Sequence, residues 1–223
     1  MTAGMSTDAP LAAGGFSAWL AGMDRALRGD ADSDVPCGSC TACCTSSQFV
    51  HIGPDEADTL AHIPAQLLFP APRLPEGHVL LGYDELGHCP MLIGGACSIY
   101  EHRPRTCRTY DCRVFPAAGV EPEEQPDIAG RTRRWQFDFA DPADEIEHEA
   151  VRAAVRFVAE RGDLLPAGTA PTSAVQRAVL AIELHGAFLR RDGASGAMAV
   201  VEPEPEAIKA VFGSRRDPPV REV

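Results

Sequence analysis

The sequence predicts an α+β protein, in which a small irregular domain of short strands and helices precedes a helical C-terminal region. Two observations lead to this prediction. All eight cysteines of the 223-residue chain lie between Cys37 and Cys112, and two later stretches have apolar residues at helical spacing. The hydrophobic fraction of 45% allows a core of ordinary size for a globular protein.

We expect four segments along the chain. Residues 1–34 form a lead with one weak amphipathic helix, roughly from Phe16 to Leu27. Residues 35–115 hold every cysteine and form a metal-binding domain. Residues 116–200 supply a strand and a pair of helices that pack on each other or cover the cysteine domain. Residues 201–223 form a flexible, acidic and proline-rich tail with a short helix at most.

Within the cysteine segment the local patterns predict short elements. They are a strand at 48–52, a helix opened by Pro54 that ends before Pro64, a loop at 64–77, a strand at 78–83, a tight hairpin or loop at 89–97, and a helical turn carrying Cys107. Proline at a first helical position and acids in the first turn support the helix.

After the last cysteine, residues 116–126 look like a linker, rich in Pro, Gly and Glu. Residues 134–139 alternate like an edge strand. Asp141-Pro142 caps a helix that runs to about Arg161, and Ser173 with Gln176 matches the capping box of a second helix.

The chain is acidic, with 32 Asp and Glu against 20 Lys and Arg and a net charge of −12. This charge argues against nucleic acid and against an anionic membrane surface as partners. No basic secretory leader and no apolar stretch of membrane length are visible, so we expect a cytoplasmic protein. A protein partner and the oligomeric state are left open.

A cytoplasmic location matters for the cysteines, because thiols stay reduced there. We therefore interpret all eight as metal ligands, not disulfides. The first block reads Cys37-Gly-Ser-Cys40-Thr-Ala-Cys43-Cys44, and its C-x2-C-x2-C spacing is typical of iron–sulfur ligation. Neighbouring side chains point apart, so Cys43 and Cys44 serve two centres or one of them stands beside a centre.

The second block is more widely spaced and contains Cys89, Cys97, Cys107 and Cys112. Four cysteines in each block divide evenly into two four-thiolate sites, but the sites can be sequential or interleaved. The expected cofactor is an iron–sulfur cluster or zinc, in one or two centres.

Arginines crowd the second block. A metal with four thiolates carries a net charge of −2 for Zn²⁺ and for an oxidised four-iron cluster, and such charge is costly in a partly dry volume. We expect Arg103 or Arg108 to lie beside the thiolates and offset that charge. Arg105 and Arg113 belong to the same basic stretch.

Histidines are weaker candidates for ligands. His88, beside Cys89, is the best of them, as a ligand or a hydrogen-bond donor. For His51 and His102 we expect surface or structural roles. His148 and His185 fall on the C-terminal helices and are not expected to bind metal.

The cysteines and their flanking residues resemble the YkgJ-type cysteine-cluster family, also called the CxxCxxCC domain, a zinc- or iron-chelating domain. The resemblance covers about residues 35–115 and rests on Cys37-x2-Cys40-x2-Cys43-Cys44, Cys89-Pro90 and Cys97-Ser-Ile-Tyr100-Glu-His-Arg103-Pro104-Arg-Thr-Cys107-Arg108-Thr-Tyr110-Asp-Cys112. It implies metal chelation without an assigned reaction. A similar pattern occurs in flagellin lysine methylases, but this chain is much shorter and shows no separate cofactor motif.

Three functional interpretations remain. The first is an iron–sulfur protein in electron transfer or in an accessory role to a redox or methyl-transfer enzyme. The second is a structural or interaction module that zinc merely stabilises. The third is a metal-dependent enzyme with an open coordination position, for which the nearby polar candidates are Tyr100, Tyr110, Glu101, Asp111 and His88. Standard catalytic signatures are absent from the sequence, so catalysis is left undecided.

Overall fold

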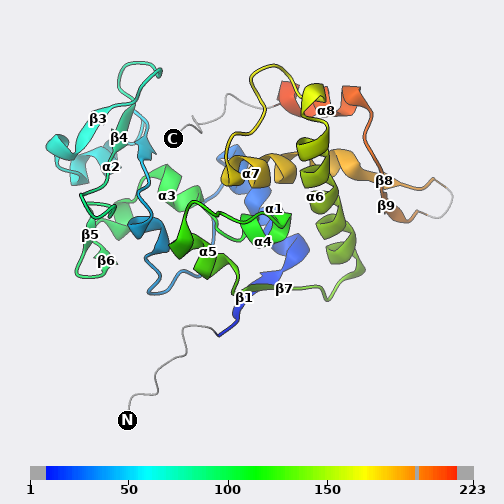
Figure 1. The fold of residues 1–223 in the computed structure, drawn as a ribbon, viewed down its shortest axis with the longest axis horizontal. Helices are drawn as coiled ribbons and strands as arrows, with labels where there is room; N and C mark the ends of the chain where they lie inside the picture. Colours follow the sequence, from blue (N-terminus) through cyan, green and yellow to red (C-terminus); the bar gives the residue numbers. More distant parts are fainter. Residues whose placement is uncertain (1–8, 194–195, 215–223) are drawn as a thin grey trace, which may run out of the picture. The chain divides into compact units, whose positions relative to one another are not determined.

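The computed structural model describes residues 9–193 and 196–214 (Figure 1). The chain divides into two compact units. Of the described residues, the cysteine unit comprises Arg25–Asp111 and Gln125–Ile128, and the helical unit comprises 9–24, Cys112–Glu124, 129–193 and 196–214. These limits differ from the expected segment ends at 34 and 115.

In the part of the chain that the structure describes, no helix has both the length and the apolar character needed to span a membrane.

The cysteine unit is built from very short helices and strands. They are η1 (Ala42–Thr45), β2 (Val50–Ile52), α2 (Ala57–His62), η2 (Ala65–Leu67), β3 (Leu68–Pro70), β4 (Val79–Leu81), β5 (Leu92–Ile93), β6 (Ala96–Cys97), η3 (Tyr100–His102) and α3 (Arg105–Thr109).

A three-stranded antiparallel sheet in the order β2-β4-β3 supports this unit. In its register, both Val50 and Leu68 pair with Leu81 on the central strand. The buried core against the sheet consists of Val50, Ile52, Ile63, Leu81, Met91 and Ile99. Cys89 and Cys97 pack against this core, so the core itself positions two of the candidate ligands.

Most expected elements of this unit are confirmed, including both strands, the 89–97 hairpin and the helical turn with Cys107. Gly94 and Gly95 form the hairpin turn with φ of 61° and 81°, a conformation that glycine adopts without a Cβ clash. Two expectations were wrong. Helix α2 starts at Ala57, because Gly53 donates its N–H to the Glu56 carboxylate at 2.9 Å and closes a turn first. The expected loop at 64–77 contains η2 and β3.

The helical unit has its own core. Its elements are β1 (Leu11–Gly15), α1 (Phe16–Arg28), α4 (Val114–Ala118), α5 (Pro126–Thr132), β7 (Trp135–Asp138), α6 (Pro142–Glu160), η4 (Gly162–Leu164), α7 (Ala174–Leu184), η5 (His185–Phe188), β8 (Leu189–Arg191), β9 (Met198–Val200) and α8 (Pro205–Ser214), with the unit boundary falling inside α1 and α5.

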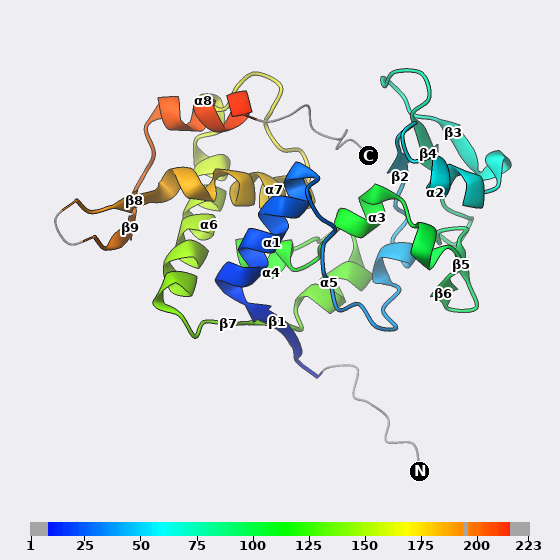
Figure 2. The same cartoon turned by 180° about the vertical axis from the view of Figure 1, so that it is seen from behind.

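Helices α4, α6 and α7 pack against one another (Figure 2). The start of α6 is confirmed where Asp141-Pro142 predicts it, with a complete capping box between Asp141 and Asp144. The Ser173 hydroxyl caps α7 by accepting from the Gln176 N–H at 3.3 Å, while the Gln176 side chain turns to the Thr172 N–H at 2.7 Å. The two predicted helices, α6 and α7, pack against each other.

Other expectations for this unit were met in part. The 116–126 linker overlaps the end of α4 and the start of α5, and the lead contains strand β1, which pairs in parallel with β7, before the expected helix α1. The short helix expected in the tail is α8, and its Ile208 is fully buried. Residues 215–223 lie outside the described part of the chain.

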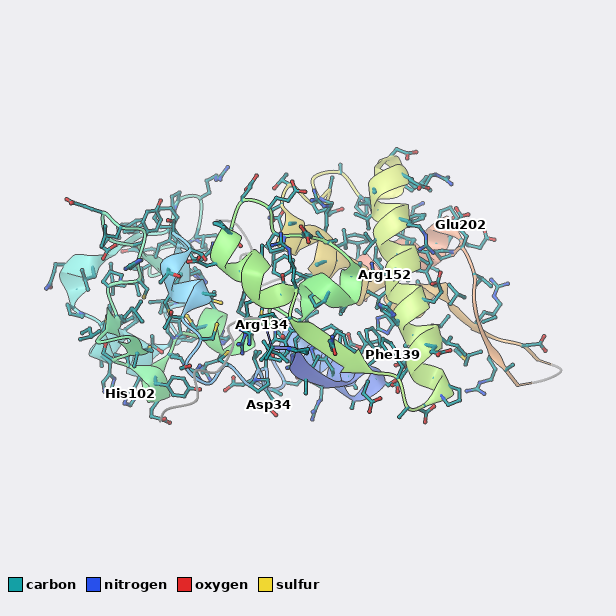
Figure 3. All side chains as sticks on the ribbon, turned by 60° about the horizontal axis from the view of Figure 1, so that its bottom comes forward. Asp34, His102, Arg134, Phe139, Arg152 and Glu202 are labelled. Carbon is teal, nitrogen blue, oxygen red and sulfur yellow. The ribbon has the colours of Figure 1, made fainter. Side chains whose placement is uncertain are left out.

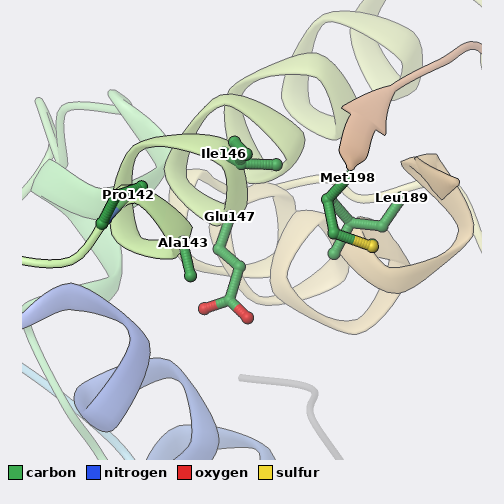
Figure 4. A pocket seen from close by; sticks show the side chains of 6 residues that line it. All are labelled: Pro142, Ala143, Ile146, Glu147, Leu189 and Met198. Atoms are coloured by element: carbon green, nitrogen blue, oxygen red, sulfur yellow. The ribbon is translucent and has the colours of Figure 1, made fainter. Parts of the chain in front are cut away.

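A small apolar hollow of about 220 Å³ lies on the helical unit, lined by Pro142, Ala143, Ile146, Glu147, Leu189 and Met198 (Figure 4). Glu147 contributes the carboxylate of this lining, and no other charged side chain lines it. Such an apolar lining offers few polar anchors for a small ligand.

Candidate metal centre

Four cysteine thiols from both sequence blocks come together in the cysteine unit. Cys44 lies in η1, Cys89 precedes the β5–β6 hairpin, Cys97 ends β6 and Cys107 lies in α3. Each of the four thiols is electrostatically coupled to the other three. We call Cys44, Cys89, Cys97 and Cys107 the thiol tetrad.

Local backbone contacts hold the tetrad in place. The Cys89 N–H donates to the Cys44 carbonyl at 2.7 Å and so joins the two sequence blocks directly. Cys97 pairs with Leu92 across the hairpin, and the Cys107 N–H donates to the Pro104 carbonyl at 2.9 Å. Sulfur atoms, yellow in Figure 3, gather beside η1 and α3. Thiols of both sequence blocks therefore lie near one another in the cysteine unit.

Three of the tetrad thiols, Cys44, Cys89 and Cys107, resist ionisation. Burial, together with the smaller effects of the neighbouring thiols Cys89 and Cys97, raises the pKa of Cys44 to about 11. Burial also raises the pKa of Cys107 to about 12 and shifts that of Cys89 upward. Cys107 keeps part of its surface open to solvent, although protein atoms crowd around its thiol. Grouped, partly desolvated thiols of this kind match the donor set of a thiolate metal site.

The other four predicted ligands have different surroundings. Cys37 and Cys40 are partly buried, and both are coupled electrostatically to Cys44. Cys43 is exposed, whereas its neighbour Cys44 is not. Cys112 belongs to the helical unit, where it is 7% exposed and its sulfur accepts the Trp135 indole N–H at 3.2 Å. Cys37 and Cys40 therefore lie near Cys44, in addition to the other tetrad thiols.

The two candidate arginines behave differently. Arg103 is electrostatically coupled to Cys107 and acts to lower its pKa, against the larger effect of burial. Its guanidinium stacks 3.6 Å from the centre of the Tyr100 ring and donates to the Tyr100 carbonyl at 2.8 Å. Arg108 instead pairs with the Asp32 carboxylate at 3.0 Å. Arg103 is therefore the residue that can offset thiolate charge.

The remaining polar candidates have other partners. The His88 N–H donates to the Asp84 carboxylate at 2.8 Å, and the Asp111 carboxylate accepts from the Ser33 hydroxyl at 3.0 Å. His51 stacks on His78, with 2.9 Å between their ring nitrogens. These contacts give His51 and Asp111 structural roles.

One group of potential ligands was missed by the sequence reasoning. The donor atoms of Asp58, His62 and His102 all lie within 4.8 Å of one another. The i, i+4 spacing of Asp58 and His62 on α2 was a signal for two of the three residues, but His102 joins them only through the tertiary fold.

A comparison with family models agrees with the thiol geometry. Residues 36–128 match the CxxCxxCC family model, whose description is "Putative zinc- or iron-chelating domain". The resemblance seen in the sequence is confirmed for residues 36–128. No curated protein and no solved structure was found to match the chain.

Proposed function

We propose that the thiol tetrad holds an iron–sulfur cluster and that the protein acts in electron transfer or as an accessory to a redox enzyme. The observation that carries this proposal is that the tetrad gathers thiols from both sequence blocks, with Cys37 and Cys40 also near Cys44. A single tetrahedral zinc site uses only four protein ligands. The C-x2-C-x2-C spacing of Cys37, Cys40 and Cys43, which lie outside the tetrad, is independently typical of iron–sulfur ligation.

The chemistry of the site supports a bound cation of some kind. With the pKa values of Cys44 and Cys107 raised to about 11 and about 12, these thiols keep their protons at neutral pH. A metal centre supplies the positive charge that stabilises thiolates in such surroundings. Arg103 adds one positive charge near Cys107, which favours a centre with net negative charge.

The decisive experiment is metal analysis of the protein purified without oxygen. We expect a brown protein with visible charge-transfer absorption, and iron and acid-labile sulfide in about equal amounts, as in cubane and rhombic clusters. A colourless protein with stoichiometric zinc and no sulfide would overturn the cluster.

The second candidate is a zinc-stabilised structural or interaction module. The short strands and small core of the cysteine unit favour it, because small loop-rich domains often depend on a metal for stability. In that case a colourless protein would lose the structure of this unit on chelation and show no redox signal.

A further inference from the structure

We propose that Asp58, His62 and His102 form a second, exchangeable metal site for a borderline divalent transition-metal ion such as Zn²⁺, separate from the thiols. Two imidazoles and one carboxylate are donors that Zn²⁺, Co²⁺ and Ni²⁺ accept. No cysteine belongs to this group. The proposal does not depend on the identity of the metal at the thiol tetrad.

The three side chains already contact one another. The His102 Nδ1 atom lies 2.7 Å from Asp58 Oδ2. The His62 Nδ1 atom is hydrogen-bonded to the Asp58 backbone carbonyl at 2.8 Å and lies 3.8 Å from Asp58 Oδ1, so its Nε2 atom is the nitrogen left for a metal. The two imidazole rings are stacked, with their centroids 3.5 Å apart and an angle of 6° between their planes. The Asp58 carboxylate and the two imidazoles are thus already grouped, with the carboxylate hydrogen-bonded to His102.

Two elements hold this group together. Asp58 and His62 are one turn apart on α2, which places their side chains on one helix face. His102 ends η3 (labelled in Figure 3). The buried Thr59 of α2 donates its hydroxyl to the Arg103 carbonyl at 3.5 Å, directly after η3. This hydrogen bond joins α2 to the segment after η3, beside the three side chains. A metal ion therefore binds to elements that already lie close together.

The opposite face of α2 anchors it in the core. Ile63 is buried in the core cluster, and Leu60 packs against that cluster together with Cys89 and Cys97. The helix therefore turns its apolar residues toward the tetrad's supporting core and its Asp58–His62 pair toward solvent.

The exposure of the three side chains and the negative charge of the protein suit an ion that exchanges with solvent. The side chains of Asp58, His62 and His102 are 70%, 41% and 37% exposed. Water can thus complete the coordination sphere, as in sites with only three protein ligands. The hydrogen bond from His102 lowers the pKa of Asp58 and keeps it ionised, and the net charge of −12 attracts cations to the protein surface.

Metal binding requires a modest local change. Parallel rings do not aim their nitrogen lone pairs at one point, so at least one imidazole must turn about its side-chain bonds. Exposed rotamers change readily, and the metal replaces the proton now shared by His102 and Asp58. We therefore expect binding that is weaker and faster to exchange than binding at the thiols.

The test is a calorimetric titration of Zn²⁺ into the full-length protein carrying its thiol-bound metal, with metal and sulfide content measured before and after. We expect about one additional Zn²⁺ per chain in the wild-type protein. Asp58→Asn, His62→Gln and His102→Gln should each weaken that binding by about tenfold or more, since each removes one ligand. The thiol-bound metal should stay unchanged in all three variants.

The matched control is His78→Gln, because His78 stacks on His51 in the same unit but is not part of the triad. This variant should bind the additional Zn²⁺ like the wild type. A titration with Mg²⁺ should show no binding, because imidazoles are poor ligands for Mg²⁺.

Three results would overturn the proposal. One is additional Zn²⁺ binding that survives in Asp58→Asn and His102→Gln, and another is equal binding of Mg²⁺. The third is loss of the thiol-bound metal in all three triad variants, which would show that the triad is a structural hydrogen-bond group. A failure of the thiol proposal appears separately, in the metal and sulfide content of the untitrated wild-type protein.

Discussion

Cys43 and Cys44 are adjacent in the chain, yet their surroundings differ. Both lie in η1, where a tight turn rotates successive side chains by about a third of a circle. Cys44 faces the second sequence block and its pKa is raised, whereas Cys43 is exposed. The sequence predicted that the pair separates. The hydrogen bond between the Cys89 N–H and the Cys44 carbonyl places Cys44 beside the second sequence block.

The tetrad makes a direct prediction at Cys107. Replacing it by Ser removes one thiolate, and we expect Cys107→Ser to lose more than half of the bound metal and to become less soluble. The control is Thr106→Ser, on the same helical turn, which keeps the hydroxyl that donates to the His51 carbonyl at 2.8 Å. Equal metal content in Cys107→Ser and the control would contradict the assignment. Metal analysis by mass spectrometry measures the difference.

The raised thiol pKa values predict proton release on metal binding. Cys44 and Cys107 have pKa values of about 11 and about 12 and carry their protons at pH 7, while metal-bound cysteine is a thiolate. Adding Zn²⁺ to metal-free protein at pH 7 should therefore release about two protons or more per chain, and the apparent affinity should rise with pH. An indicator dye in weak buffer measures the release, and Cys44→Ser should release fewer protons. Release of no protons would contradict thiol ligation.

Gly119 illustrates a residue that only the fold explains. It ends α4 with φ of 67°, and a Cβ at this position would overlap the Arg152 guanidinium. We expect Gly119→Ala to lower the free energy of unfolding by about 1–3 kcal/mol. The control is Gly130→Ala in α5, where a Cβ meets no atom within 4 Å and an alanine favours the helix. Thermal denaturation compares the two, and equal effects would contradict the clash.

At the scale of elements, local signals determined α6 most clearly. The Asp141 carboxylate accepts the Ala143 N–H at 2.8 Å, and Asp144 accepts the Asp141 N–H at 3.0 Å. Asp144 also accepts the Ser17 N–H at 2.8 Å from the start of α1. The same carboxylate therefore caps one helix and fixes the beginning of another, which sequence periodicity does not reveal.

This double role gives a prediction for α6. Asp141→Ala should cost about 1 kcal/mol of stability, the usual value for a helix cap. Asp144→Ala should cost more, since it leaves the N–H groups of both Asp141 and Ser17 without their acceptor. Glu160→Ala, at the exposed end of the same helix, is the control and should have little effect. Chemical denaturation gives the order, and a smaller cost for Asp144→Ala than for Asp141→Ala would contradict the dual contact.

Strands were harder to predict than helices. β3 lies in a Pro-rich stretch and β1 in a Gly-rich one, and neither shows clear alternation. Both exist because a partner strand supplies hydrogen bonds, β4 for β3 and β7 for β1. The context dependence of strand formation explains why these segments were expected to be irregular.

At the scale of the whole molecule, each unit has its own core, and only the cysteine unit contains the tetrad. We expect removal of metal by a chelator without oxygen to unfold the cysteine unit before the helical unit. In hydrogen exchange, β2 and β4 should lose protection while α6 and α7 retain it. Simultaneous loss in both units would show that the tetrad's metal stabilises the whole chain. The matched sample is metal-loaded protein carried through the same steps.

The sequence by itself determined the α+β class, the confinement of the cysteines to one region, the helices α6 and α7, and the match to a metal-chelating domain. These properties depend on spacing, capping and composition, which are local. Only the tertiary structure decided that Cys44 lies near Cys89, Cys97 and Cys107, that Arg103 acts on Cys107 whereas Arg108 pairs with Asp32, and that His102 meets Asp58 and His62. Such contacts join residues far apart in the chain, and their geometry follows from how β2, α2 and α3 pack on a shared core.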